Sequence, residues 1–133
     1  MDAIQTARCN CGNLEADCSG TPARVSVCHC LFCKRRTGSA FSYNATFSVT
    51  QVTVNGAFNT FRRLSETGRR AQYNFCPTCG STLFYEIEER PGMISIPAGA
   101  FADPNFLEPT TEVFGEQRNP WCALHPRSAL ARE

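Results

Sequence analysis

The sequence of 133 residues lacks several features that would point to membranes or nucleic acids. It has no run of about 18 consecutive apolar residues, the length that a membrane-spanning helix needs. Its formal net charge is only +1, which gives no general attraction to nucleic acids or acidic membrane surfaces. Residues 1–5 include neither a positively charged start nor an apolar run of the kind found in export signals. We therefore expect a cytoplasmic protein with no membrane partner, and we do not expect it to bind nucleic acid.

Helix is also poorly represented in the sequence pattern. No segment carries a sustained apolar stripe at i, i+3, i+4 and i+7, the spacing that marks one face of an amphipathic helix. Residues 34–37 are expected to form at most one helical turn before Gly38. The apolar fraction of 42% and the charged fraction of 19% are typical of a globular protein. The length suits one domain that covers residues 1–133.

Alternation of apolar and polar side chains predicts strands instead. The clearest alternation covers residues 41–47, where Phe, Tyr, Ala and Phe alternate with Ser, Asn and Thr. Asn55-Gly56 predicts a tight hairpin turn between residues 52–54 and 57–58. Further short strands are predicted at residues 71–75, 81–87, 93–96 and 111–114. We therefore predict a mainly β fold of antiparallel sheets with little helix.

The sequence has nine cysteines, so disulfides within one chain would leave one cysteine unpaired. In a protein that is not exported, the thiols are expected to stay reduced. Seven of the nine lie in tight clusters, which is typical of metal-binding thiolates. The clusters are an N-terminal pair (Cys9 and Cys11), a central cluster (Cys28, Cys30 and Cys33) and a late pair (Cys76 and Cys79). Cys18 lies outside them, and we expect it to be a small buried side chain.

Zinc fits these clusters best, because it accepts thiolates and is redox-inert; iron–sulfur clusters are the main alternative. A structural zinc site has four protein ligands, whereas a catalytic site has three and keeps one position open. One division of the seven thiols joins the N-terminal and late pairs into a closed site and leaves the central cluster as an open site. Lys34, Arg35 and Arg36 follow the central cluster, and their positive charge favours the thiolate form.

Spacing alone leaves other divisions open. Cys30 and Cys33 can instead join the late pair in a four-cysteine ribbon, which leaves the N-terminal pair free. Cys122 and His125 can also close the central site, although a buried Cys and a surface His explain this Pro-flanked tail without a metal. His29 is expected to be an exposed bystander or a proton-handling neighbour, because in an extended backbone its side chain points away from those of the adjacent cysteines.

The clusters extend into longer motifs that occur in a fixed order. They are Cys9-x-Cys11-Gly12, then Ser26-Val27-Cys28-His29-Cys30-x-x-Cys33-Lys34-Arg35-x-Thr37-Gly38-Ser39-Ala40-Phe41, then Phe75-Cys76-x-x-Cys79-Gly80. Together with Asn119-Pro120-Trp121 in the tail, these motifs resemble the glutathione-dependent formaldehyde-activating enzyme family, which includes centromere protein V. The resemblance spans nearly the whole chain, and it is specific because the three motifs agree together.

The resemblance implies a β-tent fold stapled by zinc knuckles, with two zinc ions per chain. By carry-over, the structural zinc ligands are Cys9, Cys11, Cys76 and Cys79, and the ligands of the second, catalytic zinc are Cys28, Cys30 and Cys33. The implied activity is that of a carbon–sulfur lyase, which reversibly joins formaldehyde to the thiol of its cosubstrate glutathione to give S-hydroxymethylglutathione. The sequence departs from the family at Glu112, where a His is common.

The resulting hypothesis is that a substrate thiol fills the open metal position as a thiolate and that thiolate attacks the aldehyde carbon. A hydrogen-bond donor would stabilise the developing alkoxide, and the candidates are Ser26, His29, Thr37 and Ser39. Lys34 and Arg35, together with Arg36, are candidates for binding the carboxylates of glutathione, although a run of charges also forms a solvated surface.

Two other functions compete with this hypothesis. The chain can be a non-enzymatic zinc module that binds a protein or nucleic-acid partner through the basic triplet together with Phe32 and Phe41; overall neutrality argues against nucleic acid. It can also be a thiol-exchange protein that uses Cys30 and Cys33 without a metal. The number of metal ions per chain separates these possibilities.

Overall fold

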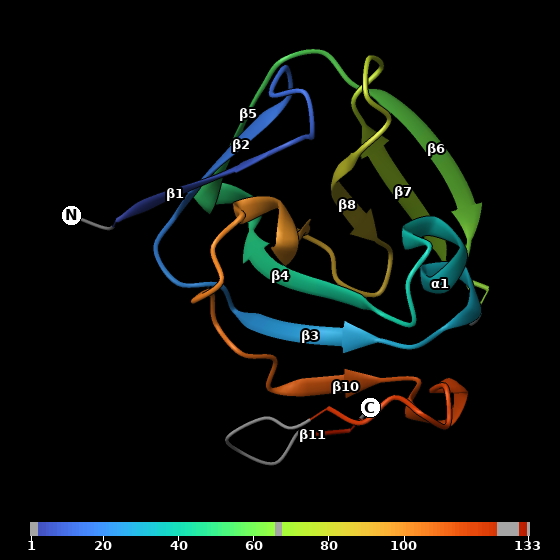
Figure 1. Ribbon diagram of the computed structural model, residues 1–133. Coiled ribbons are helices and arrows are strands. Elements are labelled where there is room, and N and C mark those ends of the chain that lie inside the picture. The colour runs from blue at the N-terminus through green and yellow to red at the C-terminus, as the bar shows by residue number, and fades with distance from the viewer. Residues whose placement is uncertain (1–2, 66–67, 125–130, 133) are drawn as a thin grey trace.

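The computed structural model of the protein describes residues 3–65, 68–124 and 131–132, whose strands form two sheets (Figure 1). The smaller sheet is antiparallel and has the order β1-β2-β5. Its strands are β1 (Ile4–Arg8), β2 (Glu15–Ser19) and β5 (Val52–Asn55). The larger sheet has the order β11-β10-β3-β4-β9-β8-β7-β6. Its strands are β3 (Arg24–Cys28), β4 (Ser42–Ser48), β6 (Asn59–Leu64), β7 (Arg70–Phe75), β8 (Thr82–Ile87), β9 (Met93–Pro97), β10 (Thr111–Val113) and β11 (Ala131–Arg132).

Most neighbouring strands of the larger sheet are antiparallel, as predicted. The exception is β10, which is parallel to both β3 and β11. Within the described ranges, helix is limited to α1 (Leu31–Thr37) and to the short 3-10 helices η1 (Val49–Gln51), η2 (Ala98–Phe101) and η3 (Gly115–Gln117). The prediction of a mainly β fold with little helix is confirmed. None of these described helices has the length and apolar character needed to cross a bilayer.

The hydrophobic core joins the two sheets. It combines buried side chains of β1 and β2 with those of β4, β8 and β9. Phe47 of β4, Leu83 of β8 and Ile96 of β9 are completely buried, and each such side chain contributes about 1.5–3 kcal/mol through the removal of apolar surface from water. Cys18 of β2 belongs to the same cluster and is 1% exposed, which confirms its predicted role as a small buried side chain.

The helix α1 is longer than predicted and starts inside the central cysteine cluster. It begins at Leu31, three residues before the expected turn, and covers seven residues. The side chain of Cys30 is the N-cap, because its Sγ accepts a hydrogen bond from the backbone N–H of Cys33 at 3.3 Å. Such a cap satisfies one of the amides that a helix start leaves free. At the other end, Gly38 stops the helix in the left-handed conformation, with φ of 68°.

The prediction of a hairpin at Asn55-Gly56 is wrong. The strand before this turn, β5, pairs with β2, whereas the strand after it, β6, pairs with β7 in the other sheet. Gly56 has φ of +110°, and a Cβ at this position would lie 2.3 Å from the backbone oxygen of Asn13. The glycine is therefore needed where the chain passes close to the β1–β2 turn and crosses between the sheets, not for a two-residue hairpin.

Candidate metal centres

Two pairs of cysteines from different sheets meet at one end of the core. Cys9 and Cys11 follow β1, and Cys76 and Cys79 lie between β7 and β8. Their four Sγ atoms all lie within 4.8 Å of one another. The Sγ of Cys11 is 3.7 Å from the Sγ atoms of both Cys9 and Cys76. This four-cysteine group has the ligand type and number of a closed zinc site, and it could bind zinc.

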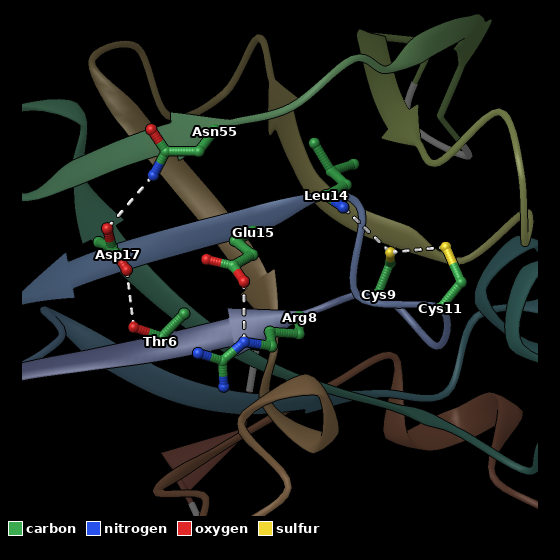
Figure 2. Close-up of polar contacts among 8 residues, drawn as sticks. All are labelled: Thr6, Arg8, Cys9, Cys11, Leu14, Glu15, Asp17 and Asn55. Carbon is green, nitrogen blue, oxygen red and sulfur yellow. Dashed lines mark hydrogen bonds and ion pairs between the residues drawn. The ribbon is translucent and has the colours of Figure 1, made fainter.

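Hydrogen bonds to sulfur favour the thiolate form of two members of the four-cysteine group, Cys76 and Cys79. The backbone N–H of Leu14 donates to the Sγ of Cys9 at 3.2 Å, beside the Sγ of Cys11 (Figure 2). The backbone amide of Cys79 lowers the pKa of Cys76, and a hydrogen bond from the side chain of Ser81 lowers the pKa of Cys79 to about 5. Zinc binds cysteine as the thiolate, so these hydrogen bonds make the sulfur atoms of Cys76 and Cys79 suitable ligands for the metal.

Polar contacts across the smaller sheet fix the turn that carries Cys9 and Cys11 (Figure 2). Arg8 Nε contacts Glu15 Oε1 at 2.9 Å between β1 and β2. The hydroxyl of Thr6 donates to Asp17 Oδ1 at 2.6 Å, and Asn55 Nδ2 of β5 donates to Asp17 Oδ2 at 3.2 Å. Because cross-strand pairs of this kind set the register, they hold the end of β1 opposite the β7–β8 turn.

The central cluster forms a separate group of three thiols. Cys28 ends β3, Cys30 caps α1, and Cys33 lies in the first turn of that helix. Their Sγ atoms also lie within 4.8 Å of one another. Cys30 and Cys33 are buried, whereas Cys28 is half-buried. This three-cysteine group could bind zinc with three of the four ligands that the metal takes.

The thiols of the three-cysteine group do not ionise equally. Hydrogen bonds from Cys28 and Cys30 are the main cause that lowers the pKa of Cys33, followed by the hydroxyl of Ser42 and the positive charge of Arg36. The same contacts with Cys30 and Cys33 raise the pKa of Cys28, because it supplies a proton that the others accept. The first thiolate of the group therefore forms at Cys33.

A cavity of about 310 Å³ opens beside the three-cysteine group. All three thiols line it, whereas no member of the four-cysteine group does. The other described lining residues are Arg24, Ser26, Asn44, Arg63, Ser65, Tyr73, Tyr85, Ile87, Glu89, Arg90, Val113 and Phe114. This volume lies at the lower end of the range of small-molecule sites. The three-cysteine group thus has space next to it for a ligand.

His29 is completely buried, so the prediction of an exposed bystander is wrong. Its Nε2 lies 2.9 Å from Oε1 of Glu112, a carboxylate that also accepts from Nη1 of Arg118 at 3.2 Å. The backbone N–H of His29 donates to the oxygen of Val113 at 2.9 Å. The ring therefore attaches β10 to the segment between Cys28 and Cys30. The sequence marked Glu112 only as a departure from the family, and 83 residues separate it from its partner.

The basic triplet after the three-cysteine group divides into three different environments. Lys34 Nζ donates to the backbone oxygen of Gln117 at 2.6 Å and to Oδ1 of Asn119. Arg35 is exposed. The guanidinium of Arg36 lies over the rings of Tyr73 and Tyr85. None of the three is among the described residues that line the cavity.

Aromatic and arginine side chains of β6, β7 and β8 complete the cavity, and the sequence reasoning missed them. Arg63 of β6 donates from Nη2 to the hydroxyl of Tyr73 at 2.6 Å and lies over the ring of Phe32 at 4.0 Å. Tyr73 and Tyr85 are directly paired in the register of β7 and β8. The strands at residues 71–75 and 81–87 were predicted, but the register of β7 and β8 shifts between Asn74 and Phe75, so counting outward from Cys76 and Cys79 does not pair the two tyrosines.

The remaining predicted site residues lie elsewhere. Ser26 is buried and lines the cavity. Thr37 and Ser39 are exposed, and the hydroxyl of Thr37 donates to the backbone oxygen of Cys33 at 2.8 Å. Cys122 is buried and belongs to neither cysteine group, while His125 lies outside the described residues. A ribbon that joins the central cluster to the late pair is not the grouping found in the described part of the chain.

The fold and the two groups define a class: a mainly β protein in which two cysteine clusters could each bind zinc, one of them beside a cavity. The sequence profile of the glutathione-dependent formaldehyde-activating enzyme matches residues 4–117. The chain therefore belongs to the glutathione-dependent formaldehyde-activating enzyme family.

A solved structure is similar in fold. It is the crystal structure of a Rhodobacter sphaeroides protein from a structural genomics programme, 24% identical in sequence, with a TM-score of 0.58. The similarity covers 71% of this chain and 85% of that chain, and it speaks for the fold alone. No curated protein sequence matches the chain well enough to count as a relative.

Proposed function

We propose that this protein is a zinc-dependent carbon–sulfur lyase that reversibly joins an aldehyde, formaldehyde or a related one, to the thiol of glutathione. The observation that supports this most directly is the difference between the two cysteine groups. One has four thiols, none of which lines the cavity described above, and the other has three thiols that all line it. A closed set suits a structural role, whereas three ligands next to free space suit a site that takes a substrate.

In this proposal Cys9, Cys11, Cys76 and Cys79 hold a structural zinc, and Cys28, Cys30 and Cys33 are the catalytic residues that hold a second zinc. When bound there, zinc supplies a Lewis acid with a free position that a thiol can fill in its deprotonated form. The low pKa of Cys33 supports metal binding at the three-cysteine group near neutral pH, because a ligand that is already ionised need not lose a proton.

The cavity side chains are proposed to bind and orient the reactants. In the forward direction a bond forms between the glutathione sulfur and the aldehyde carbon, the carbonyl π-bond breaks, and a proton is added to the oxygen. Ser26 is the favoured donor to that oxygen, because it is the one sequence-predicted candidate that lines the cavity. Its hydroxyl lies on the same wall as Cys28, two residues further along β3.

We also propose a change in the residues that bind the glutathione carboxylates. The sequence suggested Lys34 and Arg35, but Lys34 is held by the C-terminal segment and neither residue lines the cavity. Arg63 does line it, and its orientation is fixed by Tyr73. A guanidinium held in this way suits a planar, two-point contact with a carboxylate.

The proposal is tested by metal content and exchange kinetics measured together. We expect two zinc ions per chain, of which a chelator removes one readily, and acceleration of glutathione–formaldehyde exchange in NMR beyond the uncatalysed rate. Cys33→Ala should retain one zinc ion and lose the acceleration. The control is Cys18→Ala, which removes a thiol from neither group and should retain both. A wild-type protein with a single tight zinc and no acceleration would instead indicate the non-enzymatic module.

A further inference from the structure

Arg36 is a half-buried cation with an unusual set of neighbours. Its guanidinium carbon lies 5.2 Å from the ring centre of Tyr73 and 5.1 Å from that of Tyr85. Its Nε and Nη2 atoms are buried and have no hydrogen-bond partner among the residues that the structure describes. Arg63, next to the same tyrosine, differs because its Nη1 and Nη2 both donate to protein oxygens. Within the part of the chain that the structure describes, Arg36 is thus held by aromatic rings and not by a carboxylate.

A buried charge without a counter-charge is costly, so the surroundings of Arg36 should contain a negative group. The tyrosines do not supply one, because burial raises the pKa of both phenols and keeps them neutral near pH 7. The anionic candidate on the same helix is the thiolate of Cys33. The two residues are three positions apart on α1, a spacing that places side chains on the same side of a helix.

A zinc ion bound by three thiolates is negatively charged, and a nearby arginine would stabilise that charge. Such a centre has a formal charge of −1, and a substrate thiolate in the fourth position brings it to −2. The four-cysteine group would reach −2 as well, but it needs to take no further ligand, and the amides of Leu14 and Thr78 donate to two of its sulfurs. The three-cysteine group, with two buried thiols, has to accept additional negative charge each time a thiol binds.

We propose that Arg36 is a positioning residue that balances the charge of the metal-loaded three-cysteine group from its place against the rings of Tyr73 and Tyr85, without contacting the substrate. This inference rests on the metal-binding part of the proposed function. Arg36 is absent from the described lining of the cavity, whereas both tyrosines and all three thiols belong to it. Its effect is therefore exerted through charge. Removing the charge should weaken metal binding at this group and leave the four-cysteine group unchanged.

The test compares neutral and charged replacements. Arg36→Met and Arg36→Gln remove the charge, and Arg36→Lys retains it in a different shape. The control is Arg35→Met, which makes the same chemical change at the exposed neighbour on the same helix. Each full-length protein is titrated with cobalt(II), followed by the thiolate-to-cobalt absorption, and then with competing zinc. The phase that Cys33→Ala abolishes reports the three-cysteine group, and the remaining phase shows that each variant is folded.

We expect both neutral variants to bind metal at the three-cysteine group about 10- to 100-fold more weakly, the usual effect of losing a residue next to the ligands. Arg36→Lys should lose less than either, and Arg35→Met should be unchanged. Affinities within twofold of wild type in both neutral variants would overturn the proposal. So would a neutral variant that loses activity at unchanged metal affinity, because Arg36 would then act on the substrate. Weaker metal binding in a protein that lacks lyase activity would reject the proposed reaction and support the role of Arg36.

Discussion

Truncation of Glu112 should destabilise the protein far more than truncation of an exposed glutamate. The carboxylate is buried, and it faces both His29 at 2.9 Å and Arg118 at 3.2 Å. Glu112→Ala leaves the completely buried imidazole and part of a guanidinium without their partner. Removing one member of a buried pair typically costs about 3–5 kcal/mol. Because the Arg118 side chain is 36% exposed and can regain water contacts, we expect the lower value, about 3 kcal/mol.

The measurement is chemical denaturation of zinc-loaded protein, with hydrogen exchange as a local probe. A loss of about 3 kcal/mol corresponds to a fall in Tm of roughly 10 °C for a chain of this length. The amide of His29, which donates to Val113 of β10, should exchange faster because β10 is attached less firmly to β3. The matched control is Glu88→Ala, which breaks an exposed pair with Arg69 at 3.8 Å and should cost no more than about 1 kcal/mol. Equal losses in the two variants would refute the reasoning.

Three further predictions concern the turn, the core and the thiolates. Gly56→Ala should cost about 2–3 kcal/mol, because it adds a clash to a strained φ, whereas Gly92→Ala, at φ +77° with open space, should cost about 1 kcal/mol in the same denaturation assay. Phe47→Ala should cost about 3–5 kcal/mol and lower Tm, because the ring is fully buried. In metal-free protein, the pKa of Cys79 is lowered from 9.0 to about 5. Its thiolate therefore stabilises the folded protein to the full extent above pH 9.0, and this contribution is lost as the pH falls towards about 5. Ser81→Ala should move the alkylation profile of Cys79 to higher pH, and an unchanged profile would contradict the proposed hydrogen bond.

Local sequence patterns predicted the strands and knuckles but not which strands pair. Alternation located β4, and Cys-x-x-Cys between two alternating segments located the β7–β8 hairpin, because both signals come from residues near one another in the chain. Asn55-Gly56 gave an equally local signal, yet the chain crosses from one sheet to the other there. The pairing of β5 with β2 packs the partly buried side chains of Val52 and Val54 against the core, and this contact between distant segments outweighs the turn preference.

The cysteines of the candidate site could be predicted from the sequence, but the residues that contact them could not. Tight spacing identified the cysteines, because sulfur ligands of one metal often lie on one turn. The pairing of His29 with Glu112, in contrast, depends on β10 returning in parallel beside β3 after more than half of the chain. The start of α1 was missed for a chemical reason: the thiol of Cys30 accepts the hydrogen bond of a helix cap, a role more usual for Ser, Thr, Asp or Asn.

The central claim is that the three-cysteine group is an open metal site that takes a substrate thiol. The most direct measurement is a crystal structure of zinc-loaded protein soaked with glutathione, with metals located by anomalous scattering at the zinc edge. We predict one zinc ion within the four-cysteine group and a second bound by Cys28, Cys30 and Cys33, with the glutathione sulfur as its fourth ligand. A second site that contains no metal, or that a protein side chain closes while glutathione stays outside the cavity, would contradict the account.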